Sequence, residues 1–188
     1  MSQPSLLRSA VAALDAAGVA YMLTGSIVSS LQGEPRATHD IDIVVELPPE
    51  AFETFLKHFG ALDLFVDEPS VRAAVEDRRM FNFIDTRSGD KIDFWPLTPD
   101  TFDASRFARR VRVEAIGTSF FVSAPEDTIL MKLRWARLSA DSPKQIADAR
   151  GVYEVQAGVL DAAYLDEWAG RLGVSDLLDE VRRRAEQV

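Results

Sequence analysis

The chain has 188 residues, of which 47% are hydrophobic and 27% charged, a composition typical of a globular protein and not of a disordered or fibrous one. It contains no cysteine, which excludes disulfides, thiolate metal sites and cysteine nucleophiles. The formal net charge of −9 argues against a surface that coats nucleic acid nonspecifically, because neutralising phosphates requires clustered Lys and Arg.

The composition also limits the choice of metal and of cell compartment. His39 and His58 are the two histidines of the chain, so a metal ion would be held mainly by carboxylates, the ligands that magnesium, manganese and calcium prefer. No apolar run is long enough to span a bilayer, and the amino-terminal residues lack the apolar stretch of a secretory signal. We therefore expect a cytoplasmic protein without membrane contact.

The amino-terminal third begins with a predicted helix, strand and helix. Apolar residues at helical spacing predict a helix over residues 5–17, which Gly18 ends. Residues 19–23 form a short β-prone run, and a Thr-Gly-Ser turn follows at residues 24–26. The helical pattern returns over residues 27–31, so the order is strand, tight turn, helix.

Further strands and helices are predicted towards the middle of the chain. The sequence DIDIVV at residues 40–45 alternates acids with aliphatic residues and predicts a strand. A stripe of phenylalanines predicts a core-facing helix over residues 52–60, and a short helix is expected over residues 69–75. Residues 80–84 and 91–95 flank a turn-forming segment and predict an antiparallel hairpin.

The last part of the chain changes from strands to helices. Residues 111–115 and 119–122 predict another strand pair, and the pattern is helical beyond Pro125. We expect a core over residues 1–124 and a helical cap over residues 125–188, packed together as one compact unit. The predicted fold is α/β (α+β): a mixed sheet with antiparallel edges, acids on one face and helices on the other.

Three acids are predicted to share one face of this sheet. Asp40 and Asp42 are two residues apart on a strand, so their Cα atoms lie roughly 6.5 Å apart and both side chains project from the same face. Ile41 then points to the opposite, core-facing side. By the same alternation, Asp93 of the segment KIDFW lies opposite its apolar neighbours, and it joins the other two acids if the strands are adjacent.

Such a cluster predicts a metal and phosphate site. Clustered carboxylates repel one another unless cations neutralise them, and two divalent ions about 3.5–4 Å apart suit phosphoryl transfer. Gly25 would let the backbone approach a phosphate closely, and Ser26 begins a helix whose amino terminus favours anions. A triphosphate could be held between this turn and the metals.

These motifs together resemble those of a known superfamily. LTGSIVSSLQGEPRATHDIDIVV at residues 23–45 is similar to the Gly-Ser turn, helix and Asp-x-Asp strand of the DNA polymerase beta-like nucleotidyltransferases, and KIDFW at residues 91–95 to their third-acid strand. The Arg-x-Thr-x-Asp lead-in at residues 36–40 resembles the small bacterial branch that includes AbiEii-type toxins and antibiotic nucleotidyltransferases. Residues 125–152 resemble the helical segment of that branch.

The resemblance implies roles for individual residues. Asp40 and Asp42 would bind both metal ions, Mg²⁺ or alternatively Mn²⁺, and Asp93 would complete one metal site and help to deprotonate the acceptor. Gly25 and Ser26 would bind the triphosphate. The reaction implied is transfer of a nucleoside monophosphate from a nucleoside triphosphate to an acceptor hydroxyl or phosphate, with release of pyrophosphate.

The cationic candidates have two interpretations each. Arg36 would bind phosphate or form an ion pair with Glu34 or another nearby acid. Lys132 would contact phosphate or form a buried pair with Asp148.

Other acids, partners and functions remain as alternatives. Asp85 and Asp90 lie near Asp93 in the sequence and are the other candidates for the third acid. The acceptor would be a small alcohol, a transfer RNA end or a protein side chain, and the likeness to toxins implies an antitoxin partner. The rival functions are a catalytically silent nucleotide-binding or antitoxin-like protein of the same fold and a metal-dependent phosphohydrolase.

Overall fold

A computed structural model describes residues 2–186 of the chain. Its internal contacts divide the chain into two units, Met1–Thr24 with Thr38–Val122, and Gly25–Ala37 with Ser123–Val188. The helices and strands, in chain order, are α1 (Gln3–Ala17), β1 (Ala20–Thr24), α2 (Gly25–Gln32), β2 (Asp40–Glu46), the 3₁₀ turn η1 (Pro49–Ala51), α3 (Phe52–Gly60), α4 (Glu68–Glu76), β3 (Phe81–Ile84), β4 (Lys91–Pro96), α5 (Thr101–Ala108), β5 (Val111–Ala115), β6 (Thr118–Val122), α6 (Pro125–Leu138), α7 (Pro143–Gln156), α8 (Ala162–Leu172) and α9 (Ser175–Ala185).

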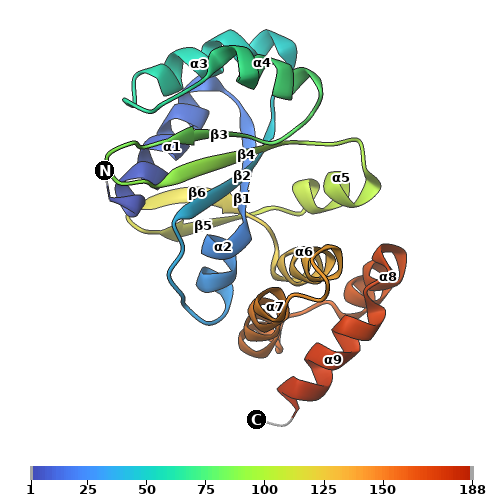
Figure 1. Cartoon of the computed structure of the whole chain (residues 1–188). Helices are drawn as coiled ribbons and strands as arrows, with labels where there is room; N and C mark the ends of the chain where they lie inside the picture. The colour runs from blue at the N-terminus through green and yellow to red at the C-terminus, as the bar shows by residue number, and fades with distance from the viewer. Residues whose placement is uncertain (1, 187–188) are drawn as a thin grey trace. The chain divides into compact units, whose positions relative to one another are not determined.

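The first unit is built on a six-stranded mixed sheet with the strand order β3-β4-β2-β1-β6-β5 (Figure 1). The edge pairs β3/β4 and β5/β6 are antiparallel, as are β1 and β2, whereas β2/β4 and β1/β6 are parallel. This arrangement confirms the predicted mixed sheet with antiparallel edges and the predicted hairpin. It also brings the strand DIDIVV directly beside KIDFW.

One face of this sheet carries the aromatic core. Phe55 and Phe59 of α3 are fully buried, and their rings lie between 5.2 and 5.8 Å from those of Phe83 and Phe94. Helix α1 contacts α3 on this side. The phenylalanine stripe is therefore a core-facing stripe, as its helical spacing predicts, and aromatic pairs of this kind each contribute about 0.5–1.5 kcal/mol beyond the area they bury.

Part of the opposite face is covered by α5, a helix that the sequence analysis does not predict. The Asp100 carboxylate begins this helix by accepting hydrogen bonds from the backbone N–H groups of Phe102 and Asp103, at 2.9 and 3.2 Å. Phe107 of α5 packs with Met22 and Val44 in a small second cluster.

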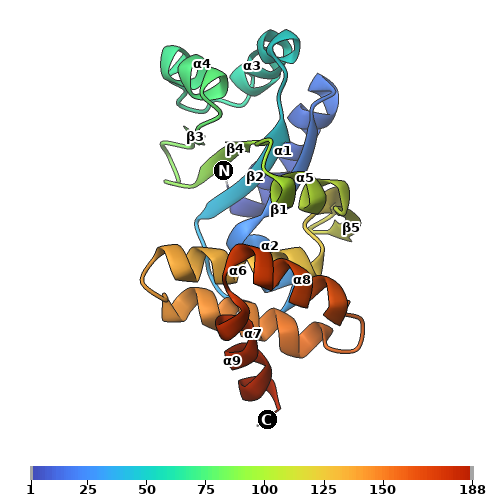
Figure 2. The same ribbon diagram turned by 90° about the vertical axis from the view of Figure 1, so that its right-hand side faces the viewer.

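The second unit is helical and consists of α2 and α6 to α9. Helix α7 contacts α2, α6 and α9, and Figure 2 shows α6 and α7 side by side. Directly after α2, a Cβ atom on Gly33 would lie 2.6 Å from the carbonyl carbon of Gly151. The backbone just after α2 therefore approaches that of α7 at a point where both residues are glycine.

The change from strands to helices expected near Pro125 lies close to Ser123, where the long segment of the second unit begins. By its contacts, α2 belongs with these later helices. None of the helices within residues 2–186 is long and apolar enough to cross a membrane.

Candidate active site

The register of β2 and β4 places the three predicted acids on one face of the sheet. Asp42 is the direct partner of Asp93 in this parallel pair, and Asp40 is the partner of Lys91. Because side chains alternate along a strand, Asp40, Asp42 and Asp93 all project from the face opposite the aromatic core. Thr24, the last residue of β1, pairs with Asp42 from the other side.

Each acid has a defined neighbour. The Lys91 ammonium lies 2.7 Å from Asp93 Oδ2 and 3.4 Å from Asp40 Oδ1. Its hydrogen bond to Asp93 is the main reason that the pKa of Lys91 is raised above its ordinary value. The Trp95 indole Nε1 donates to Asp42 Oδ1 at 3.3 Å.

The oxygen ligands of this site are of the kind that suits a hard divalent cation. Asp93 is 5% exposed, and its Oδ1 atom is buried without a hydrogen-bond partner. Such an atom is costly unless a further group satisfies it, and carboxylate oxygens are what Mg²⁺ and Mn²⁺ prefer. We therefore find that these residues fit the metal the resemblance implies.

The expected convergence of the three carboxylates is nevertheless incomplete. Among residues 2–186, no three carboxylate or imidazole side chains are gathered in a way that would already hold a metal ion. Oxygens of all three acids are instead engaged by neighbours: Lys91 lies against Asp93 and Asp40, and Trp95 donates to Asp42.

Asp85 and Asp90, the rival third acids, belong to the turn between β3 and β4. Asp85 Oδ1 accepts a hydrogen bond from the Arg87 backbone N–H at 3.0 Å. Asp90 Oδ1 lies 3.4 Å from Nδ1 of His39, whose side chain is largely exposed. Neither acid is in the register position beside Asp42, so Asp93 is the acid that the sheet places there.

The second unit holds the four candidate phosphate-binding residues. Gly25 opens α2 with a φ of 70°, in the left-handed region that strongly favours glycine. Ser26 Oγ accepts a hydrogen bond from Arg36 Nη2 at 2.6 Å. The turn thus requires glycine for its conformation, and the serine hydroxyl contacts a guanidinium.

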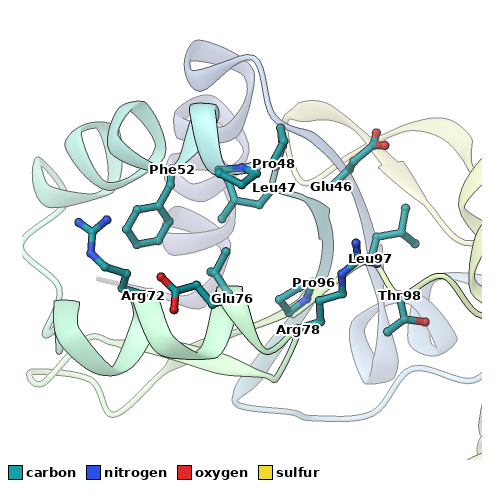
Figure 3. Close-up of a pocket in the computed structure, with 12 residues that line it drawn as sticks. Glu46, Leu47, Pro48, Phe52, Arg72, Glu76, Arg78, Pro96, Leu97 and Thr98 are labelled. Carbon is teal, nitrogen blue, oxygen red and sulfur yellow. The ribbon is translucent and has the colours of Figure 1, made fainter.

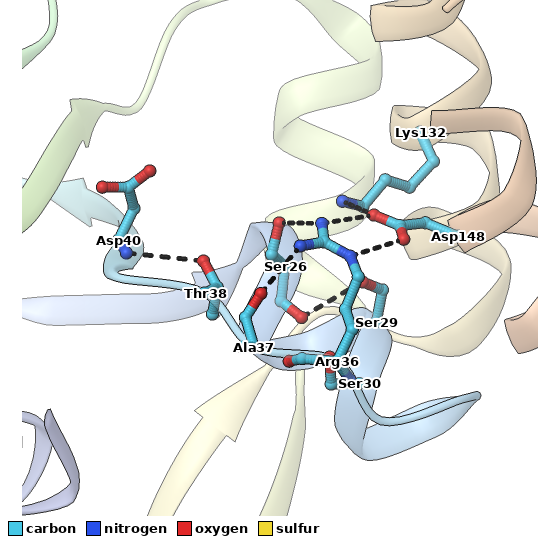
Figure 4. Close-up of polar contacts among 9 residues, drawn as sticks. All are labelled: Ser26, Ser29, Ser30, Arg36, Ala37, Thr38, Asp40, Lys132 and Asp148. Carbon is cyan, nitrogen blue, oxygen red and sulfur yellow. Dashed lines mark hydrogen bonds and ion pairs between the residues drawn. The ribbon is translucent and has the colours of Figure 1, made fainter. Parts of the chain in front are cut away.

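Asp148 joins the two cationic candidates (Figure 4). Arg36 donates to its two carboxylate oxygens through Nε and Nη2, each at 2.8 Å, and Lys132 Nζ lies 2.7 Å from Oδ2. Burial opposes ionisation of Asp148, but the hydrogen bonds from Arg36 and Lys132 outweigh it and hold the pKa of this carboxyl below its ordinary value. Lys132 therefore forms the expected pair with Asp148, and Arg36 forms its ion pair with the same, sequence-distant acid.

Hydrogen bonds of Thr38 order the start of β2. Thr38 Oγ1 accepts a weak hydrogen bond from the Asp40 backbone N–H at 3.4 Å, and Gln3 Nε2 donates to the Thr38 carbonyl at 2.7 Å. These contacts fix the direction in which Asp40 enters the strand.

A pocket at the other end of the same strands is a less convincing site. It has a volume of about 460 Å³ and lies where β2 and β4 end, with Glu46, Phe52, Pro96 and Arg78 among its lining residues (Figure 3). None of the three acids lines it, and none of the buried polar atoms without a partner in the described part of the chain belongs to it. We therefore place the candidate active site at the acids.

Known proteins resemble the chain in structure more than in sequence. No protein-family model matches the chain, and no curated protein matches it. The solution structure of the antibiotic-resistance factor ANT(2'')-Ia is similar, with a TM-score of 0.58 and 16% identity over 97% of both chains.

Two further solved structures give the same result. A nucleotidyltransferase-like protein from Paracoccidioides brasiliensis has a TM-score of 0.57 and 16% identity, over 96% of this chain and 93% of that one. The crystal structure of ANT(2'')-Ia in complex with adenylyl-2''-tobramycin has a TM-score of 0.56 and 16% identity, over 92% of this chain and 97% of that one. The likeness to AbiEii-type toxins stays a prediction from the sequence. The sequence resemblance is confirmed at the level of the fold: the chain shares its fold with ANT(2'')-Ia and with a nucleotidyltransferase-like protein.

Proposed function

We propose that the chain is a metal-dependent nucleotidyltransferase that moves a nucleoside monophosphate from a nucleoside triphosphate to an acceptor hydroxyl or phosphate. The observation that carries the proposal is the placement of Asp40, Asp42 and Asp93 on one sheet face, with Asp42 and Asp93 in direct register. The nucleotidyltransferase fold supports it. In the reaction, the acceptor oxygen attacks the α-phosphorus in line, the bond to the β-phosphate oxygen breaks, and pyrophosphate leaves.

The three acids differ in the role we assign to them. Asp40 and Asp42 are two residues apart on one strand and would both hold Mg²⁺, or Mn²⁺, in the site. When bound, the metal would neutralise the carboxylates and stabilise charge on the attacking and leaving oxygens. Asp93 would hold metal beside the acceptor and accept the proton of its hydroxyl; its unpartnered Oδ1 atom supports this assignment.

We assign the triphosphate to Gly25, Ser26, Arg36 and Lys132. The peptide bond from Thr24 to Gly25 leads directly from the residue that pairs with Asp42 into the first turn of α2. Free backbone N–H groups at a helix amino terminus favour phosphate. Arg36 and Lys132 bring two cationic groups to one carboxylate, and cationic side chains of this kind bind phosphate.

We propose only the chemical class of the acceptor. The adenylylated tobramycin in one similar structure makes a small polyhydroxylated alcohol the first acceptor to test. A transfer RNA end and a protein side chain are the other candidates, and an antitoxin partner is part of the proposal only through the sequence resemblance to toxins.

The proposal is tested by locating a transferred label. The purified protein is incubated with each α-labelled nucleoside triphosphate, Mg²⁺ and a cell extract, with and without an added aminoglycoside. We expect label on an acceptor with the parent protein and none with Asp42→Asn. A catalytically silent protein would bind the triphosphate without moving label in any fraction, and a phosphohydrolase would release free nucleoside monophosphate or inorganic phosphate.

A further inference from the structure

Lys91 places an ammonium group among the three acids of the candidate active site. It is two residues before Asp93 on β4 and in register with Asp40 on β2, so its side chain shares their face. Its Nζ atom lies 2.7 Å from Asp93 Oδ2 and 3.4 Å from Asp40 Oδ1. The side chain of Lys91 is 35% exposed, whereas that of Asp93 is 7% exposed.

These contacts use oxygens that a metal would need. A divalent cation binds carboxylates through the same lone pairs, and Mg²⁺ accepts only near-octahedral geometry with oxygens at about 2.0–2.1 Å. One oxygen of Asp93 is bonded to Lys91, while the other is buried without a partner. A metal that engages both Asp93 and Asp40 would also meet the ammonium charge directly, and like charges at such distances repel.

We propose that Lys91 is a built-in counter-ion of the acid cluster, which neutralises Asp93 and Asp40 in the absence of metal and must leave them when a divalent cation binds. Lys91 therefore lowers the metal affinity of the site and sets the cation concentration at which the site fills. Its partly exposed position lets the flexible side chain of Lys91 withdraw to solvent without unfolding the strand. This inference rests on the proposed function, because metal binding by these acids is part of that function.

The first test measures Mn²⁺ affinity without nucleotide. Mn²⁺ is titrated into parent, Lys91→Met and Lys57→Met proteins, and free Mn²⁺ is followed by electron paramagnetic resonance. Lys57 on α3 is exposed, and α3 packs on the sheet face opposite the acids, so Lys57→Met removes the same charge away from the acids and reports the effect of net charge alone. We expect a Kd roughly tenfold lower for Lys91→Met, equivalent to about 1.4 kcal/mol, and a change below about twofold for Lys57→Met.

The outcomes separate the inference from the function on which it rests. A Lys91→Met protein that binds Mn²⁺ as the parent does, or more weakly, overturns the inference while metal binding by the parent still supports the proposed function. Parent protein that binds no Mn²⁺, or an Asp42→Asn variant that binds it equally well, overturns both.

A second measurement uses the parent protein and does not depend on the folding of a variant. An amine-acylating reagent is added with and without Mg²⁺, and the modification of each lysine is followed by mass spectrometry. We expect Mg²⁺ to speed acylation of Lys91 several-fold, because the released ammonium loses its carboxylate partners, while Lys57 and Lys144 react at unchanged rates. Equal or slower acylation of Lys91 in Mg²⁺ contradicts the inference.

Discussion

Replacing Asp148 by Asn should destabilise the helical unit because it removes the charge that two cations share. The Asp148 side chain is 8% exposed and accepts hydrogen bonds from Arg36 and Lys132. Lys132 is itself 6% exposed and Arg36 26% exposed. An asparagine would keep one oxygen acceptor, but both cations would lose their carboxylate.

The size of the effect follows from this burial. Removing one partner of a buried ion pair costs about 3–5 kcal/mol, and the partly exposed Arg36 regains water, so we expect a loss of about 3 kcal/mol. For a chain of this length each kcal/mol corresponds to about 2–4 °C, which predicts a melting temperature about 6–12 °C lower. The depressed pKa of Asp148 also means that its stabilisation is present above the unfolded carboxyl pKa of about 3.9 and is lost as pH falls through the lower folded value.

Urea unfolding at neutral pH measures the difference, with Asp176→Asn as the matched control. Asp176 pairs with Arg137 at 2.6 Å, but its side chain is 69% exposed, so the control should lose less than about 1 kcal/mol. A loss below about 1 kcal/mol for Asp148→Asn, or one equal to that of the control, would refute the description of Asp148 as a buried shared acid.

Gly33→Ala should cost about 1–3 kcal/mol in urea unfolding, because its Cβ would lie 2.6 Å from the backbone of Gly151; Gly170→Ala, with open space around its Cβ, is the control and should be neutral or stabilising. Burial is the main cause that raises the pKa of Tyr21 to about 12. Its contribution to stability is therefore complete below pH about 10 and lost between about 10 and 12, a loss that Tyr21→Phe should abolish in unfolding curves over that range. Asp93→Asn should keep much of the metal and triphosphate affinity in calorimetry, while the single-turnover rate of nucleotidyl transfer falls by orders of magnitude. A near-parental transfer rate would show that another acid has the role assigned to Asp93.

The strands of the candidate site could be predicted because their pattern is local. Alternation in DIDIVV and KIDFW fixes which side chains of each strand share a face, so Asp40, Asp42 and Asp93 lie together on the condition that the two strands are neighbours. The register that makes Asp42 the partner of Asp93 comes from tertiary pairing, which alternation does not specify. Helix α5 was not predicted because it is only eight residues long and weakly apolar, although the Asp100 cap was a usable signal.

Contacts between residues that are far apart in the sequence could not be predicted from local patterns. Arg36 and Asp148 are 112 residues apart, and the sequence suggests Asp148 as a partner of Lys132 but not of Arg36. Alternation along KIDFW puts Lys91 on the same face as Asp93, but the approach of Lys91 to both Asp93 and Asp40 depends on side-chain conformation and on the parallel pairing of two strands. Nothing in a single sequence distinguishes such an internal counter-ion from an exposed lysine.

The most direct test of the central claim is to follow both ends of the triphosphate through one turnover. Parent and Asp42→Asn proteins are mixed with Mg²⁺, an acceptor-containing extract, and triphosphate labelled on either the α- or the γ-phosphate. The account predicts that the α label appears on the acceptor and the γ label in pyrophosphate, at equal rates, and that Asp42→Asn produces neither. A γ label found on the acceptor or in inorganic phosphate, or transfer by Asp42→Asn at the parental rate, would contradict nucleotidyl transfer at these acids.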